Sequence, residues 1–151
     1  MKTLIRTGIL FLIIVLFSFT TDSNGLWLTN FETAKKKAKV ENRRILISFS
    51  GSDWCSNCKR LEKAVFDTSV FQEFAKDNLV LLNADFPMRK NNKLSKEQTS
   101  HNEALAEKYN KKGVFPTTLL LDSYGKIVAK IDGKQNDVNL FVDQIKNYLN
   151  K

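Results

Sequence analysis

The sequence predicts an α/β domain in which a mixed central sheet is flanked by helices, with a C-terminal β-hairpin and a closing helix. Short, continuous apolar runs, which are typical of buried strands, alternate with segments whose apolar residues recur at helical spacing. Strands that are separated by helices imply parallel pairing through crossover connections. The last two strands are joined by only a short turn, so we expect them to pair as an antiparallel hairpin.

The first half of the domain is expected to contribute three helices and two strands. Phe31, Ala34 and Ala38 share one face of a predicted helix over 30–41, and lysines occupy the other face. The apolar run in 44–50 predicts a strand that is buried on both faces. The other elements predicted here are a helix over 55–65, a helical piece over 68–76 with Ser69 as its cap, and a strand over 79–84.

The second half begins with a polar, basic stretch over 86–99, which is expected to be the least regular part of the domain. Thr99 or Ser100 is predicted to cap a helix over 101–109. The elements expected after it are strands over 115–121 and 126–131, a turn at 122–125 between them, and a closing helix over 136–149.

The chain has two cysteines, Cys55 and Cys58, at the junction between strand 44–50 and the following helix. A disulfide between them closes a loop too small to restrict much of the unfolded chain, which favours reactivity over a stabilising role. Unpaired N–H groups at the helix N-terminus favour a thiolate on Cys55. The pattern predicts a dithiol/disulfide oxidoreductase. Two sulfurs are too few for a metal site, and the single histidine, His101, is expected at a helix surface or helix start.

Residues 1–25 have the layout of a secretory signal peptide. Lys2 and Arg6 precede an apolar stretch over 8–19, which is shorter than the about 20 residues of a comfortable membrane span. Cleavage is expected before Leu26 or, alternatively, before Asn24, and an uncleaved anchor is the other interpretation. We therefore expect residues 26–151 to form one domain in the periplasm or otherwise outside the cytoplasm.

The formal net charge of +8 comes from basic residues that are scattered along the chain. No basic stripe with interleaved aromatic residues is present, so we expect no nucleic-acid partner. The charge supports only a mild preference for acidic partner surfaces. We expect the protein to be a monomer.

Residues 26–151 resemble the thioredoxin superfamily. The resemblance rests on three motifs: the strand that runs into Trp54-Cys55-Ser56-Asn57-Cys58, the segment Phe115-Pro116-Thr117, and the hairpin turn Leu121-Asp122 to Gly125-Lys126. The chain is more narrowly similar to small exported members, the DsbH-like periplasmic disulfide reductases. The features shared with them are the approach Gly51-Ser52-Asp53-Trp54-Cys55 and Asp85-Phe86-Pro87 followed by a polar insertion.

The resemblance implies a thioredoxin-like fold and a role for each residue of the motifs. Cys55 would be the exposed nucleophile, and Cys58 would resolve the mixed disulfide. Trp54 and Phe115 would support substrate binding, and Pro116 would lie in a cis peptide bond facing the active site. The resemblance implies no cofactor besides the Cys55–Cys58 disulfide. The implied partners are exported proteins with disulfides and a membrane electron donor of the DsbD type.

Several residues depart from the superfamily pattern. Thioredoxins carry a buried carboxylate on the strand before the motif, where this chain has Ser48, and Asp53 is nearer but expected to be exposed. Proton transfer would then run through water. No cation stands between the cysteines, where the chain has Ser56 and Asn57, which argues against a strongly oxidising couple. Val114 stands where many relatives have glycine, so the sequence does not determine the geometry of the loop before Pro116.

We therefore predict a periplasmic disulfide reductase. The alternatives are a disulfide oxidase or isomerase that uses the same pair, and a non-catalytic peptide-binding module. The insertion over 86–100 is expected either to border the substrate face or to be a solvated loop.

Overall fold

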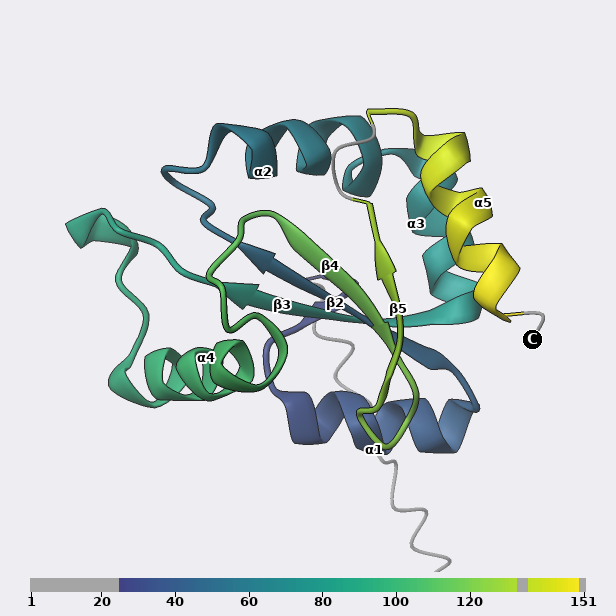
Figure 1. The fold of residues 1–151 in the computed structure, drawn as a ribbon, viewed down its shortest axis with the longest axis horizontal. Coiled ribbons are helices and arrows are strands. Elements are labelled where there is room, and N and C mark those ends of the chain that lie inside the picture. The colour runs from purple at the N-terminus through teal and green to yellow at the C-terminus, as the bar shows by residue number, and fades with distance from the viewer. Residues whose placement is uncertain (1–24, 133–135, 150–151) are drawn as a thin grey trace, which may run out of the picture.

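A five-stranded sheet separates two layers of helices in the computed structural model, which describes residues 25–132 and 136–149 (Figure 1). The strands are β1 (Trp27–Leu28), β2 (Arg44–Ser50), β3 (Leu79–Asp85), β4 (Thr117–Leu121) and β5 (Ile127–Ile131), in the spatial order β1-β3-β2-β4-β5. Strands β1 and β2 both pair parallel with β3, whereas β4 pairs antiparallel with β2 and β5. The predicted mixed sheet with a C-terminal hairpin is confirmed.

The helices are α1 (Phe31–Glu41), α2 (Ser56–Leu61), α3 (Ser69–Asn78), α4 (Lys96–Tyr109) and α5 (Val138–Leu149). Helix α2 continues directly into a π-helical segment, Glu62–Phe66, and a short 3₁₀ turn covers Lys90–Asn92. The helix predicted over 55–65 is therefore divided. Helices α1 and α4 cover one face of the sheet, and α2, α3 and α5 cover the other (Figure 1).

Two helix starts differ from the prediction. Thr68, not Ser69, caps α3, because its Oγ1 accepts a hydrogen bond from Phe71 N–H at 3.3 Å. Helix α4 begins at Lys96 and not at 101, because Ser95 Oγ accepts from Gln98 N–H at 3.2 Å. The irregular stretch after β3 is correspondingly shorter.

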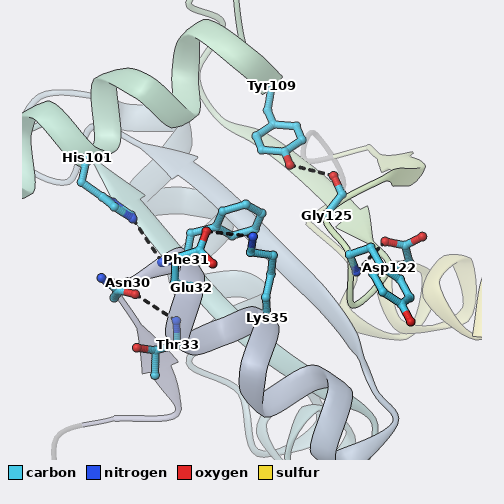
Figure 2. A network of polar contacts seen from close by, with 10 residues as sticks. Asn30, Phe31, Glu32, Thr33, Lys35, His101, Tyr109, Asp122 and Gly125 are labelled. Carbon is cyan, nitrogen blue, oxygen red and sulfur yellow. Dashed lines mark hydrogen bonds and ion pairs between the residues drawn. The ribbon is translucent and has the colours of Figure 1, made fainter.

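His101 joins α4 to the start of α1 (Figure 2). Its Nε2 accepts a hydrogen bond from Phe31 N–H at 3.1 Å, which satisfies one of the free amides of the first turn of α1. His101 lies inside α4, so it is not at the helix start, and it is partly buried because its ring faces the start of α1. Tyr109 at the end of α4 donates its hydroxyl to Gly125 O at 2.7 Å.

Each face of the sheet has its own apolar core. On one face, α1 and α4 pack over buried residues of β2, β3 and β4 such as Ile47 and Leu82. On the other, the π-helical segment, α3 and α5 pack over Leu46 and Leu120, and Phe71 and Phe141 are fully buried there. Burial of this kind supplies the main driving force for folding.

The parallel strands β2 and β3 end side by side at Ser50 and Asp85. The loops that follow them, together with the loop that leads into β4, gather at this edge of the sheet (Figure 1). Such an edge is where open α/β sheets place their functional sites.

The predicted signal peptide, 1–25, lies outside the described residues except for Gly25. Within 25–132 and 136–149, the structure contains no helix with the length and apolar character of a membrane span.

Candidate active site

Cys55 and Cys58 form a disulfide at the N-terminus of α2, with their Cα atoms 5.3 Å apart. Cys55 is the N-cap residue, and its Sγ accepts a hydrogen bond from Cys58 N–H at 3.1 Å. Because the sulfur is turned inward toward that amide, Cys55 is only 6% exposed, and the prediction of an exposed Cys55 is wrong for this disulfide form. The same N–H stabilises a thiolate on Cys55 after reduction.

Trp54 lies at the surface beside the disulfide and belongs to an aromatic cluster, Trp54, Phe86 and Phe115. Its indole Nε1 donates to Phe86 O at 2.8 Å, and its ring meets Phe115 edge-to-face at 5.5 Å between centroids. Phe86 and Phe115 are 5.4 Å apart. Trp54 remains 44% exposed, so the cluster presents an apolar surface next to Cys55.

Gly51 makes room for this arrangement. A Cβ at this position would overlap the Trp54 indole ring. Only glycine therefore allows the turn after β2 to run this close to the ring.

Pro116 follows a cis peptide bond, as the resemblance implies, and lines the same cavity as Cys58. The loop before it is held by Asn110, whose Nδ2 donates to Val114 O at 2.9 Å and whose Oδ1 accepts from Val114 N–H at 3.2 Å. Thr117 Oγ1 donates to the same carbonyl oxygen at 2.8 Å. The loop geometry that the sequence left open is therefore fixed by a buried asparagine.

Asp53 is buried, and the prediction that it is exposed is wrong. Its carboxylate accepts three hydrogen bonds, from Met88 N–H at 3.0 Å, Arg89 N–H at 2.9 Å and Asn92 Nδ2 at 3.0 Å. These bonds, that from Met88 first, hold the pKa of Asp53 below its ordinary value. Asp53 is therefore an ionised clamp on the insertion, unsuited to carrying protons near neutral pH.

A second carboxylate, that of Asp85 at the end of β3, joins the same two segments. Here the acceptor lies on the β3 side and the donors lie at the end of β2 and in the active-site turn. It accepts from Ser52 N–H at 2.9 Å, Ser52 Oγ at 2.6 Å and Ser50 Oγ at 3.2 Å. Asp53 and Asp85 together fix the active-site turn against the segment after β3.

A row of polar residues crosses the sheet beneath α2. Ser48 on β2 pairs in register with Asn83 on β3 and with Thr118 on β4, and it is only 4% exposed. Thr118 Oγ1 is buried without a hydrogen-bond partner among the described residues. Ser48 thus occupies a buried place near Cys58, but it supplies no carboxylate.

A cavity of about 560 Å³ opens beside this row, and Ser48, Cys58, Glu62 and Pro116 are among the residues that line it. Burial raises the pKa of the Glu62 carboxyl, and the negative charges of Asp67 and Asp85 raise it further. Glu62 was not among the predicted site residues, although its place one helical turn after Cys58 is visible in the sequence.

The structure brings Cys55, Cys58, Trp54, Phe115 and Pro116 together at one end of the sheet. Phe86 and Asn110 were not among the predicted site residues. Within 25–132 and 136–149, no three His, Cys, Asp or Glu side chains are placed to hold a metal ion.

Comparison with known proteins assigns this arrangement to a family. The model of the thioredoxin-like family matches residues 26–123. The chain belongs to the thioredoxin-like family. It is 28% identical over 120 residues to the disulfide bond reductase DsbH of Chlamydia pneumoniae. The aligned residues make up 80% of this chain and 70% of that protein.

Solved structures of the family agree with this assignment. A DsbH oxidoreductase is similar with a TM-score of 0.75 and 28% identity, over 82% of this chain and 83% of that one. A thioredoxin from Thermus thermophilus, at 15% identity, has a TM-score of 0.61 over 80% of this chain and 84% of its own, which supports the fold alone. The fold and the Cys55–Cys58 pair are those of a disulfide oxidoreductase.

Proposed function

We propose that this protein is an exported thiol-disulfide oxidoreductase that works mainly as a disulfide reductase. The observation that carries the proposal is the Cys55–Cys58 pair, in which Cys55 Sγ accepts a hydrogen bond from Cys58 N–H in the first turn of α2, with Pro116 lining the same cavity as Cys58. The similarity to the reductase DsbH supports the direction.

The reaction proceeds by two thiol–disulfide exchanges. The Cys55 thiolate attacks one sulfur of a substrate disulfide, so that a mixed disulfide forms and the other substrate sulfur leaves as a thiolate. Cys58 then attacks Cys55 Sγ, which forms the Cys55–Cys58 disulfide and releases the second substrate thiolate. Two electrons pass from the dithiol to the substrate.

The residues between the cysteines favour a reducing couple. Strong oxidants owe their potential to a stabilised reduced form, and here Ser56 and Asn57 supply no positive charge to the Cys55 thiolate. The Cys58 amide is the stabilising contact that the structure provides. We infer a moderate thiolate stabilisation and a correspondingly low reduction potential.

The aromatic cluster supports substrate binding beside Cys55. Trp54 and Phe115 would contact apolar side chains next to the substrate cysteine, and Pro116 would lie against the substrate backbone. We propose that the substrates are exported proteins with disulfides, and that a membrane electron donor of the DsbD type restores the dithiol in the periplasm. The enzyme would act as a monomer without a further cofactor.

The equilibrium reduction potential of the Cys55–Cys58 pair, measured against glutathione, tests the direction. A potential near or below about −230 mV supports the reductase, since thioredoxins and glutaredoxins lie in that range. A potential toward about −120 mV would make the protein an oxidant and overturn the proposed direction.

A further inference from the structure

The second exchange requires Cys58 to lose its proton in a place that water reaches poorly. Cys58 is only 5% exposed, and a buried thiol ionises with difficulty. The sheet residues beneath it are Ser48, Asn83 and Thr118, none of which can take up a proton near neutral pH. The reaction therefore needs a proton acceptor from another element.

Two nearby carboxylates are already committed to other contacts. Asp53 and Asp85 each accept three hydrogen bonds from neighbouring segments, which hold both carboxyl groups in place. Neither side chain lines the cavity beside Cys58.

Glu62 is the carboxylate on the same helix as Cys58 and in the same cavity. Its backbone N–H donates to Cys58 O, which places the two residues one helical turn apart, where side chains face the same side. Both side chains line the cavity, and Glu62 is exposed to solvent whereas Cys58 is buried. The cavity therefore connects a buried thiol to a carboxylate that exchanges protons with bulk water.

The Glu62 carboxylate has no side-chain hydrogen bond or ion pair within the described part of the chain. The other charged groups of the cavity are Asp67, Glu73 and Lys76, which come from the end of the π-helical segment and from α3. Although Glu62 as a whole is exposed, its carboxyl is partly desolvated, and this desolvation, followed by the charges of Asp67 and Asp85, raises the pKa of Glu62 and makes it a better proton acceptor.

We propose that Glu62 is the proton-relay residue for Cys58, in the place that a strand carboxylate takes in thioredoxins. This inference rests on the proposed function. As Cys58 attacks Cys55 Sγ, the Cys58 proton passes through cavity water to the Glu62 carboxylate. The Cys55–Cys58 bond forms, the bond between Cys55 and the substrate sulfur breaks, and the substrate leaves as a thiolate that takes a proton from solvent. Glu62 then releases its proton to bulk water.

The test is the single-turnover oxidation of the reduced protein by glutathione disulfide, at concentrations where resolution by Cys58 limits the rate. The rate of Cys55–Cys58 disulfide formation is measured by acid quench across a range of pH for wild type, Glu62→Gln and Glu73→Gln. Glu73→Gln is the matched control, because it removes the same group from another part of the same cavity.

Glu62→Gln is expected to slow resolution at least about tenfold near neutral pH, since general base catalysis contributes about 10²–10⁴-fold. The wild-type rate should level off above the Glu62 pKa, whereas the Glu62→Gln rate should keep rising through the thiol range until the two meet. Glu62→Asp keeps the carboxylate and should keep the levelling. Glu73→Gln should match wild type.

Two results would overturn the relay: equal pH profiles for wild type and Glu62→Gln, or equal losses in Glu62→Gln and Glu73→Gln, which would indicate only the general field of the cavity. If wild type itself formed no mixed disulfide, the proposed function would fail and not merely the relay. A second measurement uses the thiolate absorbance of Cys58 in a Cys55→Ser background. Adding Glu62→Gln there should move the Cys58 titration to lower pH, and an unchanged titration would contradict the electrostatic coupling of the two groups across the cavity.

Discussion

Asn110 orders the loop that leads to Pro116, and its replacement by alanine tests how much the site depends on that loop. The side chain is 7% exposed and makes two hydrogen bonds to the backbone of Val114. Each such bond contributes about 0.5–1.5 kcal/mol net. After the change, the Val114 carbonyl keeps its bond from Thr117, and the Val114 N–H can reach water because Val114 is 48% exposed.

We therefore expect Asn110→Ala to lower the free energy of unfolding by about 1–2 kcal/mol, toward the lower part of the sum for two bonds. Urea unfolding followed by tryptophan fluorescence measures this difference. The exposed Asn91, which has no side-chain hydrogen bond among the described residues, offers the control Asn91→Ala, and its unfolding should not change.

The same variant separates substrate binding from redox chemistry. A loosened loop before Phe115 and Pro116 should raise KM for a protein disulfide, whereas the reduction potential should stay at the wild-type value because the Cys55–Cys58 contacts remain. Insulin reduction gives KM, and equilibration with glutathione gives the potential. A loss below about 0.5 kcal/mol in Asn110→Ala, or a changed potential with an unchanged KM, would refute this reasoning.

Two further predictions concern the cysteines and the clamp. Cys58→Ser should accumulate mixed disulfides on Cys55 that appear on non-reducing gels, whereas Cys55→Ser should form none; a Cys58→Ser protein that captures no substrate would favour a peptide-binding module. The folded pKa of Asp53 lies below its ordinary value of 3.8, so the carboxylate contributes stability above that pH, and this contribution is lost as the pH falls through the folded value. Asp53→Asn should therefore weaken the loss of unfolding free energy as the pH is lowered, as measured by urea unfolding at a series of acidic pH values. A pH dependence identical to that of wild type would count against the role of Asp53 as a clamp.

Strand β2 shows what the sequence can predict well. Its bounds, Arg44–Ser50, match the predicted strand because the apolar run is continuous and buried on both faces. Strand β1 was not predicted, since its two residues are too few for any periodic pattern. The start of α4 was missed because Gln98, His101 and Asn102 attach it to the rest of the domain through hydrogen bonds, which apolar periodicity does not detect.

The residues of the active site likewise include some that the sequence predicts and others that it does not. Cys55, Cys58 and Pro116 could be found from local motifs, because their chemistry depends on neighbours in the sequence. The burial of Asp53 could not, since its partners lie 35 to 39 residues away and two of them are backbone amides. Every residue except proline carries a backbone N–H, so a hydrogen bond to such a group cannot be recognised from the residue type in the sequence.

Because the hydrogen bonds from positions 88 and 89 to Asp53 come from the backbone, the side chains beside the active site can change without loss of these bonds. Asp53 holds the insertion chiefly through the main chain at positions 88 and 89, so these two hydrogen bonds do not depend on the identity of the side chains there, although the charge of Arg89 also favours the Asp53 carboxylate. Met88 is 72% exposed on the rim beside the aromatic cluster, where a different residue would alter the shape and charge that a substrate meets. Any residue with an N–H can make these two hydrogen bonds, and proline alone would remove one of them. Specificity can therefore diversify at this rim while the redox-active turn keeps its geometry.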